Sequence, residues 1–115
     1  MDNYLLFIIA NILIGALDIV MGIPLLLEKV KPNWFYGFRL PVTLSSKEIW
    51  YKSNRYVGRD FIAAGIIIIT VSLVLLLFES NFTVLEVVWI ELTLVLASII
   101  IILARGFIYL KRISH

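Results

Sequence analysis

Three long apolar stretches constrain the fold of this chain more than any other feature of its sequence. They cover residues 4–27, 58–78 and 82–109, and the middle one has 18 consecutive uncharged residues from Phe61 to Phe78. At about 1.5 Å of rise per residue, helices of this length cross a hydrocarbon core of about 30 Å. Because lipid offers no hydrogen-bond partners to an open strand, each stretch has to be helical. The sequence therefore predicts an all-α membrane protein with three transmembrane helices.

The composition agrees with a membrane protein and excludes several function classes. Hydrophobic residues make up 62% of the chain and charged residues only 16%, whereas soluble domains have about 25% charged residues. The chain has no cysteine and a single histidine, His115, which excludes thiol catalysis, His-rich metal sites and a Ser-His-Asp triad. The sequence also lacks a nucleophile–base pair and a glycine-rich phosphate loop. We therefore expect no enzyme activity, no metal and no cofactor, and a net charge of +2 is too small to indicate direct nucleic-acid binding.

Charge is distributed unevenly around the three stretches. The span ends near the N-terminus and near the link 79–81 carry no basic residue and only the acidic residues Asp2 and Glu79. Nearly all basic residues lie in the segment 28–57 or near the C-terminus, namely Lys29, Lys31, Arg39, Lys47, Lys52, Arg55, Arg105, Lys111 and Arg112. Cytoplasmic segments of membrane proteins are enriched in Lys and Arg. We therefore predict a multi-pass protein of the cell membrane with its N-terminus outside and its C-terminus in the cytoplasm.

The link between the second and third stretches, Glu79-Ser80-Asn81, is very short. Such a link forces the two helices that it joins into an antiparallel hairpin. The sequence shows no internal repeat and no low-complexity tract. We therefore expect residues 1–115 to form a single membrane domain.

Polar residues of the first stretch share one helical face. Asn11, Gly15, Asp18 and Gly22 are separated by four, three and four positions, the spacing of neighbours on one side of a helix. Small residues on a face let another helix approach closely, and polar residues within a membrane point toward other helices. We expect this face to contact a neighbouring span.

A second polar stripe is expected on the third stretch, where Glu91, Ser98 and Arg105 are separated by seven positions. Arg105 and Asp60 fall near the same membrane boundary, which predicts an ion pair between neighbouring helices. The acids Asp18 and Glu91 allow two interpretations. They are either protonatable sites for an ion or a ligand, or hydrogen-bonded contacts that fix helix packing.

The segment 28–57 between the first and second spans is basic and rich in aromatic residues, a composition that argues against disorder. Long ordered loops are usually functional, although an interfacial collar of aromatic and basic residues would have the same composition. Ser45 and Glu48 have the spacing of a capping box. They predict a helix that runs on into the second span, with Trp50 and Asn54 on one face and Arg55 and Arg59 on another. The expected architecture thus has a long ordered cytoplasmic loop with a short helix.

This segment contains an ordered set of residues at fixed spacing, namely Pro32, Asn33, Gly37, Arg39, Pro41, Thr43, Leu44, Trp50, Asn54, Arg55 and Gly58. Their order resembles the signature loop of the SdpI/YfhL family of bacterial and archaeal membrane proteins. Leu40 replaces the usual threonine and Ser53 replaces the usual threonine or alanine, but the spacing is intact.

The resemblance implies an immunity protein that protects the cell from a secreted antimicrobial peptide toxin and that can sequester a cytoplasmic transcriptional regulator. The partners that the resemblance implies are therefore the toxin and the regulator. The residues themselves suggest membrane lipids and a second copy of the chain as further partners. This chain resembles the C-terminal module of the longer member that gives the family its name.

Two further interpretations come from the residues themselves. The chain could form a small oligomeric proton-coupled transporter or channel in which Asp18 or Glu91 titrates. Arg39 and Arg55 could also bind a lipid headgroup, because arginine suits phosphate contacts. The sequence leaves open whether Arg39 and Asn54 serve function or pin the loop to the helices.

Overall fold

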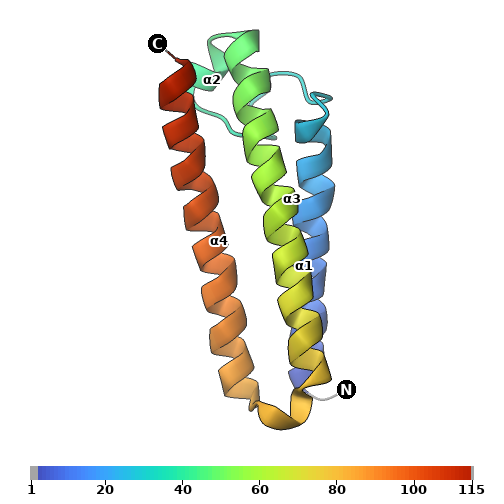
Figure 1. The fold of residues 1–115 in the computed structure, drawn as a ribbon. Coiled ribbons are helices and arrows are strands. Elements are labelled where there is room, and N and C mark those ends of the chain that lie inside the picture. Colours follow the sequence, from blue (N-terminus) through green and yellow to red (C-terminus); the bar gives the residue numbers. More distant parts are fainter. Residues whose placement is uncertain (1–2, 115) are drawn as a thin grey trace.

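Three long helices stand side by side in the computed structural model, which describes residues 3–114 (Figure 1). Each of the three is long and apolar enough to cross a membrane, which confirms the predicted all-α architecture with three spans. Asp2 and His115, which entered the sequence predictions, lie outside the described residues. In chain order the elements are α1 (Asn3–Leu26), α2 (Pro41–Leu44), α3 (Lys47–Leu77), the 3-10 helix η1 (Glu79–Asn81) and α4 (Val84–Ile113).

The connections between the helices gather at the two ends of the bundle (Figure 1). The segment 27–46 and the C-terminus lie at one end, which we call the loop end. The N-terminus and η1 lie at the other end, which we call the hairpin end. The basic segment after α1 and the basic end of α4 therefore share one side, as the charge pattern requires. That this side is cytoplasmic stays a prediction.

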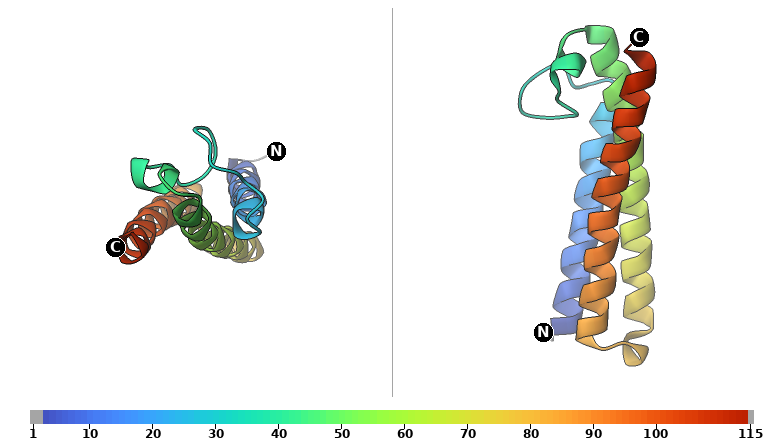
Figure 2. Two further views of the ribbon diagram at one scale, coloured as in Figure 1. Left: turned by 90° about the horizontal axis from the view of Figure 1, so that it is seen from above. Right: turned by 90° about the vertical axis from the view of Figure 1, so that its left-hand side faces the viewer.

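Helix α3 lies between α1 and α4 and contacts both (Figure 2). Its contact with α1 is close because glycines face each other at two levels. A Cβ atom added to Gly15 would lie 2.8 Å from the carbonyl oxygen of Gly65, and one added to Gly22 would lie 2.6 Å from that of Gly58. Small residues let helix backbones approach in this way. The face of α1 that carries Gly15 and Gly22 thus packs against a neighbouring span, as expected.

Apolar side chains fill the bundle at both ends. Near the hairpin end, a buried cluster joins all three long helices through Tyr4, Ile8, Leu75 and Val87. Near the loop end, a second cluster joins α3 to α4 through Val57, Ala64 and Ile102, with Phe38 of the loop packed against it. The loop is thus attached to the same core as the spans.

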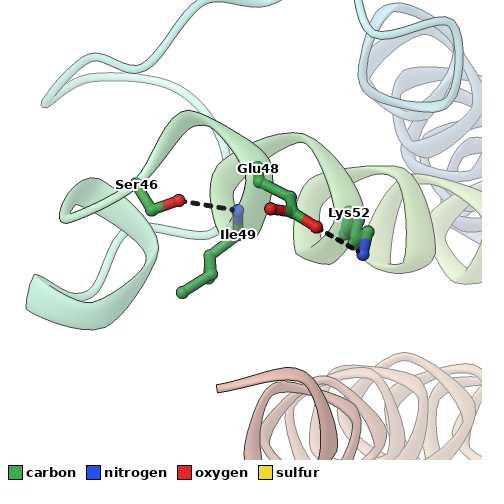
Figure 3. Close-up of polar contacts among 4 residues, drawn as sticks. All are labelled: Ser46, Glu48, Ile49 and Lys52. Atoms are coloured by element: carbon green, nitrogen blue, oxygen red, sulfur yellow. Dashed lines mark hydrogen bonds and ion pairs between the residues drawn. The ribbon is translucent and has the colours of Figure 1, made fainter. Parts of the chain in front are cut away.

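The start of α3 differs from the predicted capping box. Ser45 ends α2, because its amide and its hydroxyl both donate to the carbonyl of Val42, at 3.3 and 2.6 Å. Ser46 is instead the N-cap of α3, and its hydroxyl accepts the amide of Ile49 at 3.4 Å (Figure 3). The predicted capping box between Ser45 and Glu48 is therefore wrong, because the N-cap lies one residue later than predicted.

The side chain of Glu48 also has a different partner from the one predicted. It forms an ion pair with Lys52 one turn further along α3, at 2.8 Å (Figure 3). The physical reason is that Pro41 starts the short helix α2, whose last turn requires Ser45. The predicted short helix between the first and second spans is confirmed, at Pro41–Leu44. The continuous helix from the loop into the second span is also present, from Lys47 to Leu77.

We predict that Gly65→Ala destabilises the bundle more than Gly106→Ala. A Cβ on Gly65 would lie 2.4 Å from the backbone oxygen of Gly15, so the two helices must separate. A Cβ on Gly106 would meet only side-chain atoms of Val57 and Phe38, at 3.1 Å or more, and these can adjust. Overpacking of this kind costs about 1–3 kcal/mol. Thermal unfolding in detergent, followed by circular dichroism, measures the difference, and equal losses for the two variants would contradict the glycine contact.

Candidate functional site

The loop that carries the signature residues leaves α1, turns back, and projects to one side of the bundle before it reaches α2 (Figure 2). The chain reverses just after α1, where Glu28 has a φ of 58°. The loop then returns to α3 and packs against it. The hydrogen bonds and the exposure of its side chains decide which functions the loop can have.

The side chain of Asn54 on α3 holds the segment of the loop that returns to this helix. Its Oδ1 accepts the amide of Phe38, and its Nδ2 donates to the carbonyls of Trp50 at 3.0 Å and of Phe38 at 3.4 Å. Asn54 is buried, so no solvent replaces these bonds. Gly37 has a φ of 112°, and a Cβ there would lie 2.6 Å from Asn54 Oδ1. Glycine is therefore required at this position both for its backbone conformation and for the close approach.

Trp50 lies beside Asn54, as the predicted common face requires. Its ring is fully buried, and its indole Nε1 donates to the carbonyl of Val30 at 2.8 Å. This bond ties the first part of the loop to α3, whereas Asn54 ties the later part. One face of α3 therefore fixes both arms of the loop.

Asn33 shapes the middle of the loop. Its Oδ1 accepts the amides of Phe35 and Tyr36, both at 2.8 Å, and its Nδ2 donates to the carbonyl of Lys31 at 2.7 Å. The hydroxyl of Tyr36 in turn donates to the carbonyl of Met21 on α1. Burial raises the pKa of Tyr36 above its ordinary value, so the hydroxyl keeps the proton that it donates.

Two further motif residues, Arg39 and Thr43, also bond to the loop backbone. The guanidinium of Arg39 donates to the carbonyl of Trp34. The hydroxyl of Thr43 accepts the amide of Leu40 at 2.8 Å and donates to the Leu40 carbonyl at 2.9 Å. Pro41 is the first residue of α2, where its missing amide proton costs nothing.

Most of the predicted loop residues therefore form one hydrogen-bonded unit on one face of α3. Pro32 is half-buried and directly precedes this unit, whereas Arg55 is exposed and does not join it. The residues that the structure brings together are Asn33, Gly37, Arg39, Pro41, Thr43, Trp50 and Asn54.

The loop leaves an aromatic tip exposed, formed by Trp34 and Phe35. These two side chains are 71% and 89% exposed. They lie between the bonds of Asn33 and the anchor of Asn54, so the backbone beneath them is held while the rings remain uncovered. We call this pair the loop tip.

Sequence reasoning missed two residues of the loop, Tyr36 and Phe38. Phe38 packs edge-to-face on Phe107 of α4, with ring centroids 5.6 Å apart, and lies against Gly106. The run of aromatic residues around Gly37 was visible in the sequence. It did not show which rings face the bundle.

The predicted polar residues of α3 and α4 pair with each other. Arg105 Nε and Asp60 Oδ2 are 2.7 Å apart, which confirms the expected ion pair. Glu91 is fully buried, and its Oε1 accepts the hydroxyl of Ser72 at 2.8 Å. Within the described part of the chain, its second oxygen, Oε2, has no hydrogen-bond partner.

The predicted polar residues of α1 behave differently. Asn11 is buried and donates to the carbonyl of Phe7 in its own helix at 2.9 Å. Asp18 is half-buried and lies beside Gly65 of α3. The structure does not bring Asp18 and Glu91 together, because Asp18 faces α3 from α1 and Glu91 faces it from α4. Among residues 3–114, no group of three or more His, Cys, Asp or Glu side chains could hold a metal ion.

These features define a multi-pass, all-helical membrane protein with an ordered loop built from a recognisable motif. The model of the SdpI/YfhL protein family matches residues 29–109, which is more than half of the chain. The chain therefore belongs to the SdpI/YfhL family. The matched region contains nearly all of the loop, α2, α3 and most of α4. Neither a search of curated proteins nor a search of solved structures gave a significant match.

We predict that Asn54→Ala releases the loop while the spans stay folded. The variant leaves the amide and carbonyl of Phe38 without their partner, which costs about 1–3 kcal/mol. Arg39 is followed by Leu40 and is a trypsin site in the loop. Cleavage after Arg39 should become at least about tenfold faster, because proteolysis follows the population of the opened loop. The control Asn81→Ala, at the hairpin end, should leave cleavage unchanged, and an equal effect of both variants would contradict the role of Asn54.

Proposed function

We propose that this protein acts as an SdpI-type immunity and signal-transduction protein, which protects the cell from a secreted antimicrobial peptide toxin and binds a cytoplasmic regulator through its loop. Membership of the family supports this proposal. The observation that carries the regulator part is the loop itself. Its motif residues bond to the loop backbone and to α3, and the loop tip stays uncovered.

The loop tip has the properties of a protein-binding surface. Trp34 and Phe35 are exposed, and aromatic side chains of this kind dominate the binding energy of many interfaces. Lys31 and Arg39 are also exposed and lie within four positions of this pair in the sequence. Their positive charge favours a partner with acidic residues around an apolar pocket. Because the backbone is already ordered by Asn33 and Asn54, binding costs little conformational entropy.

The proposed topology places the two activities at opposite ends of the bundle. The distribution of Lys and Arg supports a cytoplasmic loop end, where the regulator would bind. The toxin would then contact the hairpin end. This end exposes the apolar side chains Phe78, Leu85 and Trp89, which suit an amphipathic peptide at the outer membrane surface.

Expression in a toxin-sensitive bacterium tests the proposal. We expect cells that make this protein to survive a dose of secreted toxin peptide that kills cells with the empty vector. Affinity purification from its own host should recover a cytoplasmic regulator together with the protein. Unchanged survival and no regulator in the eluate would contradict the proposal.

The double variant Trp34→Ala/Phe35→Ala separates the two activities. We predict that regulator recovery falls at least about tenfold, as expected for the loss of aromatic binding residues, whereas survival against toxin is retained. Val42→Ala serves as a matched control, because Val42 is exposed in the neighbouring helix α2 but lies outside the loop tip. Equal recovery with the double variant and the control would exclude the loop tip as the binding surface.

A second candidate function is a small oligomeric proton-coupled transporter, and the observation that favours it is the unpartnered Oε2 of buried Glu91. Ionisable groups within a membrane frequently mark ion pathways. Proteoliposomes under a pH gradient test it. Flux that Glu91→Gln or Asp18→Asn abolishes would support transport, and wild-type vesicles without pH-dependent flux would exclude it.

A further inference from the structure

A basic cavity lies at the loop end, on the face of α3 opposite to the loop. Lys52, Arg55, Tyr56 and Arg59 recur at helical spacing about half a turn away from Trp50 and Asn54. The cavity has a volume of about 380 Å³. Its remaining walls are Leu26 at the end of α1, Glu28 just after that helix, and Tyr109 of α4.

Among the described residues, two of the cavity's cations have no ionic partner. Lys52 is paired with Glu48 at 2.8 Å. Within residues 3–114, Arg55 and Arg59 form no ion pair, although Glu28 contributes one carboxylate to the wall. Two unpaired guanidinium groups in one cavity fit a ligand with negatively charged oxygens, because each guanidinium can donate two parallel hydrogen bonds to a phosphate.

The aromatic wall of the cavity holds one of these guanidiniums in place. Tyr56 and Tyr109 stack with ring centroids 4.2 Å apart. The guanidinium carbon of Arg59 lies 5.2 Å from the Tyr56 ring centroid, within the range of a cation–π interaction. The cavity is therefore partly organised before a ligand arrives.

Tyr56 and Arg105 link the basic cavity to an apolar groove further along α3 and α4. The guanidinium of Arg105 also lies 5.2 Å from the Tyr56 ring, and Arg105 and Asp60 form one end of the groove. The groove runs between α3 and α4 toward the hairpin end and has a volume of about 210 Å³. Ala63 and Ala97 leave room in its walls because their side chains are small.

We propose that the cavity and the groove together bind one anionic phospholipid, with its phosphate between Arg55 and Arg59 and an acyl chain in the groove between α3 and α4. The positive charge of Arg55 and Arg59 is complementary to the phosphate of the headgroup. The order from a basic cavity at the loop end to an apolar groove further along the bundle matches the order of headgroup and acyl chain in a phospholipid. Juxtamembrane Lys and Arg residues attract anionic lipids in this way. The sequence suggested a headgroup site formed by Arg39 and Arg55. The site proposed here differs, because Arg39 belongs to the loop on the opposite face of α3, where it donates to the Trp34 carbonyl. This proposal is independent of the proposed function.

Native mass spectrometry of the detergent-solubilised protein tests the headgroup site. Titration with phosphatidylglycerol should show tighter binding than titration with phosphatidylcholine. Arg55→Gln/Arg59→Gln should weaken phosphatidylglycerol binding at least about tenfold. The control Lys111→Gln/Arg112→Gln removes the same charge from the exposed end of α4 and should change binding little. Equal losses for both pairs would overturn the proposal in favour of diffuse surface charge.

The groove is tested with a filled variant. Ala97→Leu should weaken phosphatidylglycerol binding, whereas Ala104→Leu, at an exposed position of α4 outside the groove, should not. Glycerol phosphate, the headgroup without acyl chains, should bind much more weakly than the lipid. Equal binding of glycerol phosphate would overturn the proposal and leave a site for free phosphate. Self-association of the protein through the groove would overturn the proposal as well. It would be shown by a dimer that Ala97→Leu disrupts while lipid binding stays unchanged.

Discussion

The hydrogen bonds of the buried Asn54 side chain are the interaction on which the order of the loop depends. A long loop at a membrane surface has many backbone groups that need partners, and one side chain on α3 binds both the amide and the carbonyl of Phe38. Trp50 binds the other arm of the loop from the same face of the helix. Because α3 also contacts α1 and α4, the loop is fixed to the central element of the bundle.

This arrangement gives α3 two faces with different roles. One face holds the loop through Trp50 and Asn54 and continues into Gly58 and Gly65, which pack against α1. The opposite face presents Arg55 and Arg59 to the basic cavity. The motif of the SdpI/YfhL family thus has a direct structural meaning in this chain. Its asparagines and Gly37 order the backbone, and the two side chains of the loop tip stay exposed.

The sequence predicted the spans because long apolar stretches have few alternatives in lipid. It also contained signals that were missed. Gly58 and Gly65 have the same spacing of seven as Gly15 and Gly22, and this equality could have identified the contact between α1 and α3. Thr83 and Glu86 form a true capping box at the start of α4, whereas the same spacing at Ser45 failed because the preceding helix α2 uses that serine. Local patterns alone could not show that Tyr36 reaches Met21 or that Asp18 and Glu91 stay apart, because these contacts depend on how the helices pack.

Hydrogen exchange of the wild-type protein in lipid nanodiscs tests the central claim most directly. If the motif orders the loop, the amides of Phe35, Tyr36 and Phe38 in the segment 35–38 exchange slowly, since Asn33 accepts the first two and Asn54 accepts the third. Exchange in this segment should then be clearly slower than in an unstructured peptide of the same sequence. Exchange at the rate of the free peptide throughout the segment would show that the loop is not held by these side chains and would contradict the account.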